Sequence, residues 1–304
     1  MAKQKSDALS TDSLFGHVKD ADYFHVPRVL DFADGDGHLA LPQPMKFDEP
    51  ITLLQSPMPA INKMVEPLDG RLTKFMVLEL VAALLIAVIF ISLARKIRGG
   101  GRPVGRTWNF LEAFLVFLRD EVARPAIGKH DADRFLPFIW TLFFFVLGCN
   151  LLGMVPWMGS PTGALAVTSM LAIITFAVVV GAGMAKMGPV GFWTGQVPEM
   201  DLPFVLAIFL VPLIFVLEVG GLLIKHFVLA VRLLANMFAG HIVLAVIVAF
   251  ISAAWMSPMI WGIAPASVLG ATALSLLELF VAFLQAYIFA FLAALFIGMA
   301  VHPH

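Results

Sequence analysis

Long apolar blocks constrain the fold of this chain more than any other feature. Of its 304 residues, 60% are hydrophobic and 13% are charged, and the mean hydropathy is +0.91. A helix of about 20 apolar residues crosses the hydrocarbon core of a membrane, which is about 30 Å thick. Five blocks reach that length, at residues 75–94, 135–155, 164–185, 203–254 and 264–301. The sequence therefore predicts an all-α polytopic membrane protein with about five membrane helices.

The last two blocks are too long for a perpendicular span. They contain 52 and 38 residues, or roughly 78 and 57 Å of continuous helix. Because membrane helices are tilted by only about 20° on average, these two must be strongly inclined, kinked or divided in two. In the first of them, the candidate positions for a kink or break are Pro212 and Gly220-Gly221.

The segments between the blocks predict one further helix and two connections. Residues 107–128 carry Trp108, Leu111, Leu115 and Leu118 at spacings of three and four, which is typical of an amphipathic helix on the membrane surface. The uncharged turn PWMGSPTG predicts a hairpin, and KMGPVGFWTGQVPEMDLP predicts a loop. The expected helices cover about 75–96, 107–128, 134–156, 162–186, 203–254 and 264–301, and together they form a membrane domain over residues 71–304.

The distribution of charge predicts the orientation. Residues 1–70 hold eleven acidic and six basic side chains, whereas residues 95–106 hold five basic and no acidic ones. Basic residues accumulate on the cytoplasmic side of short loops, so the first helix is expected to run inward. The tail 1–70 would then be extracytoplasmic, and the C-terminus cytoplasmic.

Polar residues recur at helical spacing in the last two blocks. Glu218, Lys225 and Arg232 are seven residues apart, so they share one face, and Asn236 extends that face by one turn. His241 is nine residues past Arg232 and falls on the opposite side. In the last block a stripe of small and polar residues, which favours close helix packing, consists of Ala271, Ser275, Glu278, Ala282 and Gln285.

Four ionised side chains in these helices indicate a function. Each costs about 2.5 to 3.5 kcal/mol near the bilayer centre, so protein or water is expected to line the polar stripe. Carboxylates and histidines exchange protons, whereas arginine keeps its charge. Titratable groups on either side of Arg232 therefore predict a proton path with an electrostatic barrier.

Several polar residues also have a purely structural interpretation. Glu218 and Lys225 could form simple ion pairs with a neighbouring helix, and Asn150 is expected to make an interhelical hydrogen bond. His226 could bond locally or carry protons. The terminal histidines are too dispersed for a metal site, the single cysteine, Cys149, is interpreted as a packing residue, and no cofactor is expected.

Two segments closely resemble subunit a of the F-type ATP synthases, the membrane stator of their proton channel. They are VRLLANMFAGH, residues 231–241, and ELFVAFLQAYIFAFL, residues 278–292. The resemblance covers about residues 75–301, but not the tail 1–70. It implies that Arg232 faces a ring of c subunits, each with one mid-membrane carboxyl group.

The same resemblance implies roles for the neighbouring residues. Asn236 corresponds to a polar neighbour of the arginine, and Gln285 to a glutamine opposite it. His241 and Glu278 match the acid and histidine of the half-channel that opens away from the catalytic head. Glu218 matches a carboxylate of the other half-channel, and a nearby basic position is matched by Lys225.

The implied protein is a non-catalytic, proton-translocating stator subunit of a bacterial plasma (inner) membrane. Its implied partners are the c-subunit ring, b-type peripheral stalk subunits, other ATP synthase subunits and membrane lipid, with no nucleic acid. A stand-alone ion-coupled secondary transporter is the alternative, although such folds commonly contain inverted repeats and none is evident here. A passive membrane anchor is a third possibility.

Overall fold

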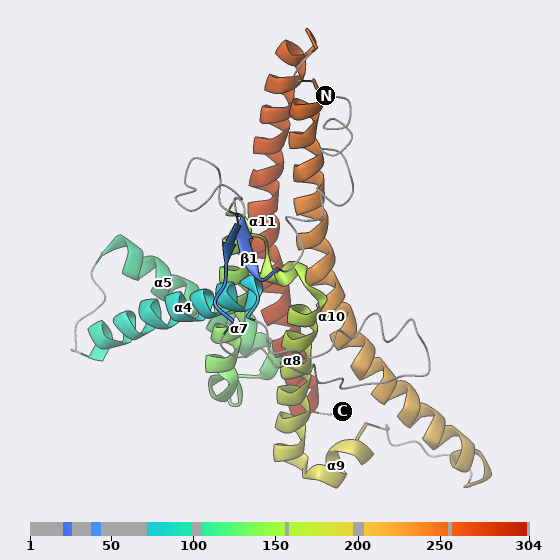
Figure 1. The fold of residues 1–304 in the computed structure, drawn as a ribbon. Coiled ribbons are helices and arrows are strands. Elements are labelled where there is room, and N and C mark those ends of the chain that lie inside the picture. The colour runs from blue at the N-terminus through green and yellow to red at the C-terminus, as the bar shows by residue number, and fades with distance from the viewer. Residues whose placement is uncertain are drawn as a thin grey trace.

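The computed structural model has the all-α membrane architecture that the sequence predicts. It describes residues 21–25, 38–43, 72–98, 105–155, 158–196, 204–254 and 257–302. Within these ranges five helices are long and apolar enough to cross a membrane. They are α4 (Lys74–Arg98), α7 (Ala132–Gly153), α8 (Leu165–Met187), α10 (Phe204–Ala254) and α11 (Ile260–Val301), as Figure 1 shows.

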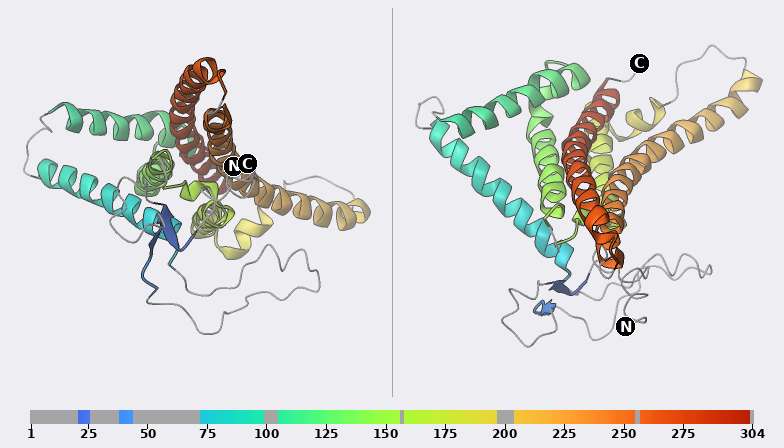
Figure 2. Two further views of the ribbon diagram at one scale, coloured as in Figure 1. Left: turned by 45° about the horizontal axis from the view of Figure 1, so that its top comes forward. Right: turned by 90° about the horizontal axis from the view of Figure 1, so that it is seen from above.

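The predicted amphipathic helix is present as three consecutive helical segments. They are α5 (Arg106–Phe117), the π-helical η2 (Leu118–Ala123) and α6 (Arg124–Ile127). The apolar side chains of Leu118 and Val122 are buried, and the indole of Trp140 on α7 donates a hydrogen bond to the Leu115 carbonyl at 3.1 Å. In Figure 2, α5 runs across the ends of α4 and α7, an orientation that suits a helix at a membrane surface.

The two predicted connections differ in outcome. Between α7 and α8 a short 3-10 helix, η3 (Pro161–Gly163), closes the expected hairpin. Within the expected loop after α8, however, the chain forms the short helix α9 (Pro189–Thr194). Gly188, with φ +80°, ends α8, and Pro189 occupies the first helical position, where a missing backbone N–H costs no hydrogen bond.

The two long blocks form two continuous helices. α10 passes through Pro212 and Gly220-Gly221 as a single α-helix of 51 residues, so it is not divided in two. α11 begins at Ile260, four residues before the expected start, and contains Pro265 near its N-terminal end. Both are steeply inclined relative to α7 and α8 (Figure 2), as their excess length requires.

Two short strands lie beside the start of α4. β1 (Tyr23–His25) pairs antiparallel with β2 (His38–Ala40). The side-chain amide of Gln43 bonds to the backbone N–H and carbonyl of Leu72, each at 2.9 Å. The strands are thereby tied to the first membrane helix. Most of the tail 1–70 lies outside the described residues, so its extracytoplasmic location stays a prediction.

α11 is the central helix, in contact with α7, α8 and α10. Near its C-terminal end, a Cβ on Gly298 would collide with the carbonyl oxygen of Ala126, so only glycine permits this close approach to α6. Just beyond, the Asp131 carboxylate pairs with Lys186 of α8 and, at 3.3 Å, with His302 after α11. These contacts hold three helix ends together.

The described elements gather at two ends of the molecule. α5, α9 and the C-terminal end of α11 lie at one end, as the right-hand view of Figure 2 shows. The strands, the α7–α8 turn and the start of α11 lie at the other. We call these the C-terminal end and the strand end of the molecule.

Candidate functional site

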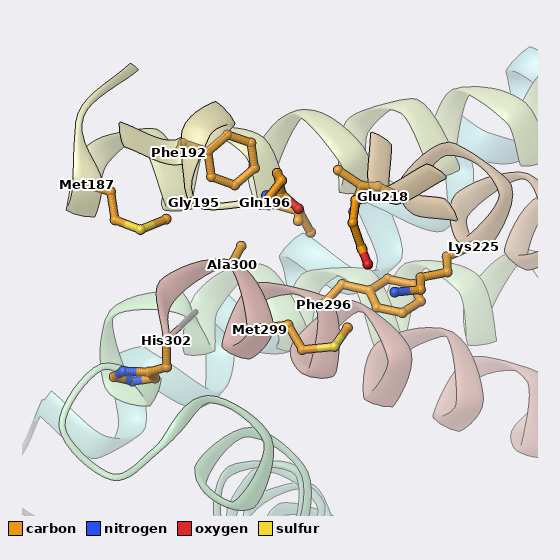
Figure 3. A pocket seen from close by; sticks show the side chains of 12 residues that line it. Met187, Phe192, Gly195, Gln196, Glu218, Lys225, Phe296, Met299, Ala300 and His302 are labelled. Carbon is orange, nitrogen blue, oxygen red and sulfur yellow. The ribbon is translucent and has the colours of Figure 1, made fainter. Parts of the chain in front are cut away.

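The polar face of α10 begins at a cavity near the C-terminal end of the molecule. The cavity has a volume of about 250 Å³ and is lined by residues of α8, α9, α10 and α11. Glu218 and Lys225 both line it, and Figure 3 places their side chains on its wall. Gln196, just after α9, adds a further polar side chain, one that the sequence analysis treated only as part of a loop.

The simple ion-pair interpretation of Glu218 and Lys225 finds no support. Both side chains are exposed, and among the described residues neither takes part in an ion pair. They instead present one acidic and one basic group to a shared cavity. That arrangement can hold water and exchange protons with it.

Arg232 lies seven residues further along the same helix, about 10 Å beyond Lys225. Its side chain is only partly exposed, and no described residue forms an ion pair with its guanidinium. Asn236, one turn on, is also partly exposed. A fixed cation that has no ion-pair partner among the described residues leaves its charge available to another group.

His241 and Glu278 come together about 14 Å further along α10 than Arg232, on the side towards the strand end of the molecule. His241 Nδ1 lies 3.5 Å from Glu278 Oε1, and the two side chains are 12% and 5% exposed. Within the described part of the chain, His241 Nε2 and Glu278 Oε1 have no hydrogen-bond partner. Because unpaired buried polar atoms are costly, this pair is suited to water or to a proton in transit.

The burial of residues along α11 shows which face of that helix carries Glu278. Glu278 and Gln285 are buried at 5% and 6% exposure, and Ala282 between them is fully buried. The flanking Leu276 and Phe280 are more than half exposed. Glu278, Ala282 and Gln285 therefore face the protein interior, as their spacing predicts, whereas Ala271 and Ser275, at the start of the stripe, are only partly buried.

Two further residues can be compared with their sequence-based interpretations. His226 Nδ1 donates a local hydrogen bond to the Leu222 carbonyl at 2.8 Å, and the ring packs on Phe176 and Phe296. This supports the local interpretation. The predicted interhelical bond of Asn150 is confirmed, because its Nδ2 donates to the Ala282 carbonyl on α11 at 3.2 Å.

Some polar residues near this site were missed in the sequence. Thr162 and Ser160, in the α7–α8 turn, are buried and hydrogen-bonded to each other, and Thr162 also bonds to Asn150. In the sequence, the one indication of their role is that two hydroxyl side chains lie in a turn that its Pro and Gly residues predict. Among the described residues there is no group of three or more metal-ligating side chains.

Comparison with known proteins adds a separate line of information. The chain matches the model of the family described as ATP synthase A chain over residues 76–298. It is 43% identical over 243 residues to the ATP synthase subunit a of Myxococcus xanthus, covering 78% of this chain and 76% of that one. It is 39% identical over 289 residues to that of Chloroherpeton thalassium, with 91% and 78% covered.

Proposed function

Because the chain belongs to the ATP synthase A chain family, we propose that it is the proton-translocating stator subunit of a rotary ATP synthase. In this proposal Arg232 separates two offset half-channels that face a ring of c subunits. The observation that carries it is the position of Arg232, which lies on α10 between the cavity of Glu218 and the pair formed by His241 and Glu278.

His241 and Glu278 form the inlet in this proposal. A proton from outside passes to them and neutralises a ring carboxylate. The neutral carboxyl can then turn into lipid, where its ionised form would be prohibitively costly. The buried, unpaired atoms of the two side chains support this role, since they need a water or proton partner.

Arg232 acts after the c-ring has made nearly a full rotation. As a ring carboxyl approaches, the positive charge of the guanidinium favours its ionised form and so favours proton release. The same charge repels protons that would otherwise leak from inlet to outlet. The absence of an ion pair to Arg232 among the described residues supports this role.

The outlet is the cavity that Glu218 and Lys225 line. It lies about 10 to 20 Å along α10 from Arg232, counted at helical rise. Its location at the C-terminal end of the molecule agrees with the orientation predicted from charge, in which the C-terminus is cytoplasmic. The membrane in this proposal is a bacterial plasma membrane.

The proposed partners follow from this role. The c-ring would contact the side of α10 that carries Arg232, where the apolar residues Val228 and Val243, at helical spacing from it, are exposed. b-type stalk subunits and other ATP synthase subunits would hold the chain against rotation. The chain itself would carry out no catalysis.

The test is ATP-driven proton pumping by the whole complex in vesicles. Arg232→Ala is expected to reduce pumping to background while the complex still assembles with its c-ring. Arg134→Ala, at an exposed arginine near the start of α7, is the matched control and should pump normally. Normal coupled pumping by the Arg232 variant would refute the proposal.

A second experiment distinguishes the proposed stator subunit from a stand-alone transporter. A stator subunit should copurify with a DCCD-reactive ring of c subunits and be inactive when reconstituted alone. Ion transport by the purified chain without a ring would favour the transporter instead.

A further inference from the structure

A buried chain of hydrogen bonds connects the α7–α8 turn to α11. Ser160 Oγ lies 2.8 Å from Thr162 Oγ1, and Thr162 Oγ1 lies 2.6 Å from Asn150 Oδ1. Asn150 Nδ2 in turn lies 3.2 Å from the Ala282 carbonyl oxygen. The three side chains are at most 1% exposed, so water does not compete for these bonds.

Which of these groups donate and which accept gives the series of hydrogen bonds a single direction. The Ala282 carbonyl can only accept, so the NH₂ of the Asn150 amide must face it and the amide oxygen must face Thr162. That oxygen also only accepts, so the Thr162 hydroxyl donates to it. Ser160 is then the donor to Thr162. The Asn150 amide therefore has one orientation in which all its partners are satisfied.

The point of attachment on α11 lies between two residues of the candidate site. Ala282 is four residues after Glu278 and three before Gln285, so the three share one helix face. A bond to its carbonyl therefore limits both rotation and sliding of that face. The partners in this bond are 132 residues apart in sequence, so it ties the hairpin of α7 and α8 directly to the helix that carries the proton-exchanging carboxyl.

We propose that Asn150, oriented by Thr162 and Ser160, is a positioning residue that holds Glu278 and Gln285 in register with α10. Glu278 needs such support because its own Oε1 has no hydrogen-bond partner among the described residues, and its neighbour His241 Nδ1 is 3.5 Å away. Its place is determined by the helix that bears it rather than by bonds to its carboxyl group. This inference rests on the proposed function.

The test uses one pair of substitutions at Thr162 in the intact complex, reconstituted into vesicles. Thr162→Val removes the hydroxyl that orients the Asn150 amide, whereas Thr162→Ser keeps it. Thr162→Val is expected to lower ATP-driven pumping roughly tenfold, because even a small misplacement of a reacting group lowers the rate strongly. It should also move the pH of half-maximal pumping, since Glu278 changes its surroundings. Thr162→Ser should restore both.

Thr175→Val is the matched control. Thr175 is as fully buried as Thr162, but among the described residues its hydroxyl bonds within its own helix alone, to the Leu171 carbonyl at 2.8 Å. It should leave the rate and the pH profile unchanged. Equal effects of the Val substitutions at 162 and 175, or a loss at 162 without a change in pH profile, would overturn the inference and leave only a packing role.

Asn150→Leu should reproduce the effect of Thr162→Val in a stronger form. If that variant does not assemble, the Thr162 pair decides the question alone. Arg232→Ala and Glu278→Gln are measured in parallel. Normal pumping by those two would refute the proposed function, whereas their inactivity together with wild-type behaviour of Thr162→Val would refute only the positioning role.

Discussion

A Cβ on Gly240 of α10 would lie 2.8 Å from Oε1 of Glu278 on α11. Atoms do not approach so closely without a shift of one of them, so the absence of a side chain at position 240 creates the space for the Glu278 carboxyl group. The next residue on α10 is His241, the neighbour of that carboxyl. The geometry of the pair thus depends on a glycine that itself exchanges no proton.

Gly240→Ala is therefore expected to impair pumping by displacing Glu278 from His241. Overpacking of this kind costs about 1 to 3 kcal/mol, which the flexible carboxylate side chain can relieve by moving away. The complex should assemble, and ATP-driven pumping should fall several-fold. Gly181→Ala on α8, where a Cβ meets nothing within 4 Å, serves as the control, and equal pumping by the two variants would contradict the expectation.

Gly298→Ala should lower stability rather than alter the proton path. The methyl group would meet the backbone carbonyl of Ala126, which cannot turn aside as a side chain can, and a cost of about 1 to 3 kcal/mol is expected. Thermal unfolding of the purified complex should begin at a lower temperature. Gly262→Ala, on the same helix with open space around it, should be neutral or slightly stabilising.

Glu218→Gln tests the outlet cavity. If Glu218 exchanges protons as proposed, its replacement should lower ATP-driven pumping by roughly tenfold or more without loss of the c-ring from the complex. Glu112→Gln removes an exposed carboxylate of α5, outside the cavity, and should leave pumping intact. An unchanged rate in the Glu218 variant would mean that protons leave by another route.

The lowered pKa of Asp131 leads us to expect that the stability of the folded protein falls in acid. A hydrogen bond from Lys186 and the nearby charges of Lys186, His302 and His130 lower the pKa of Asp131. Since this pKa is lower in the folded than in the unfolded state, the carboxylate stabilises the fold fully above the ordinary pKa of about 3.9. That contribution is lost as the pH falls through the lower folded pKa.

Thermal unfolding measured between about pH 5 and pH 3 can check this. The unfolding temperature of the wild-type protein should fall more steeply with acidification than that of Asp131→Asn, which lacks the titrating group. Equal slopes of unfolding temperature against pH for the two proteins would show that this ion pair does not stabilise the contact between the ends of α7, α8 and α11.

Much of the fold could be predicted because hydropathy and helical period act locally. The membrane helices, the hairpin at the Pro- and Gly-rich turn, and the buried stripe containing Glu278 and Gln285 all follow from patterns within a few dozen residues. His241 and Glu278 were expected as a pair only through the family resemblance. The structure places them together, while their role in proton transfer remains a prediction.

Other features depend on contacts between distant parts of the chain. Asn150 was expected to bond to another helix, but neither Ala282 as its partner nor Thr162 as its support has a local signal. The cluster around Asp131 joins residues up to 171 positions away, from Asp131 to His302. Pro212 and the two glycines were candidate positions for a kink or a break in α10, and the helix is not divided there, because local helix-breaking tendencies are weak beside the requirement to satisfy every backbone group in lipid.

The unbroken course of α10 has a mechanical consequence. Glu218 and His241 are 23 residues apart on this helix, roughly 34 Å measured along its axis, which bends as Figure 1 shows. In the proposed function these two residues belong to the outlet and the inlet, so a break between them would let the two half-channels move relative to each other. Because one continuous helix carries both, their spacing would be set by this stationary subunit and would not depend on the number of c subunits in the ring.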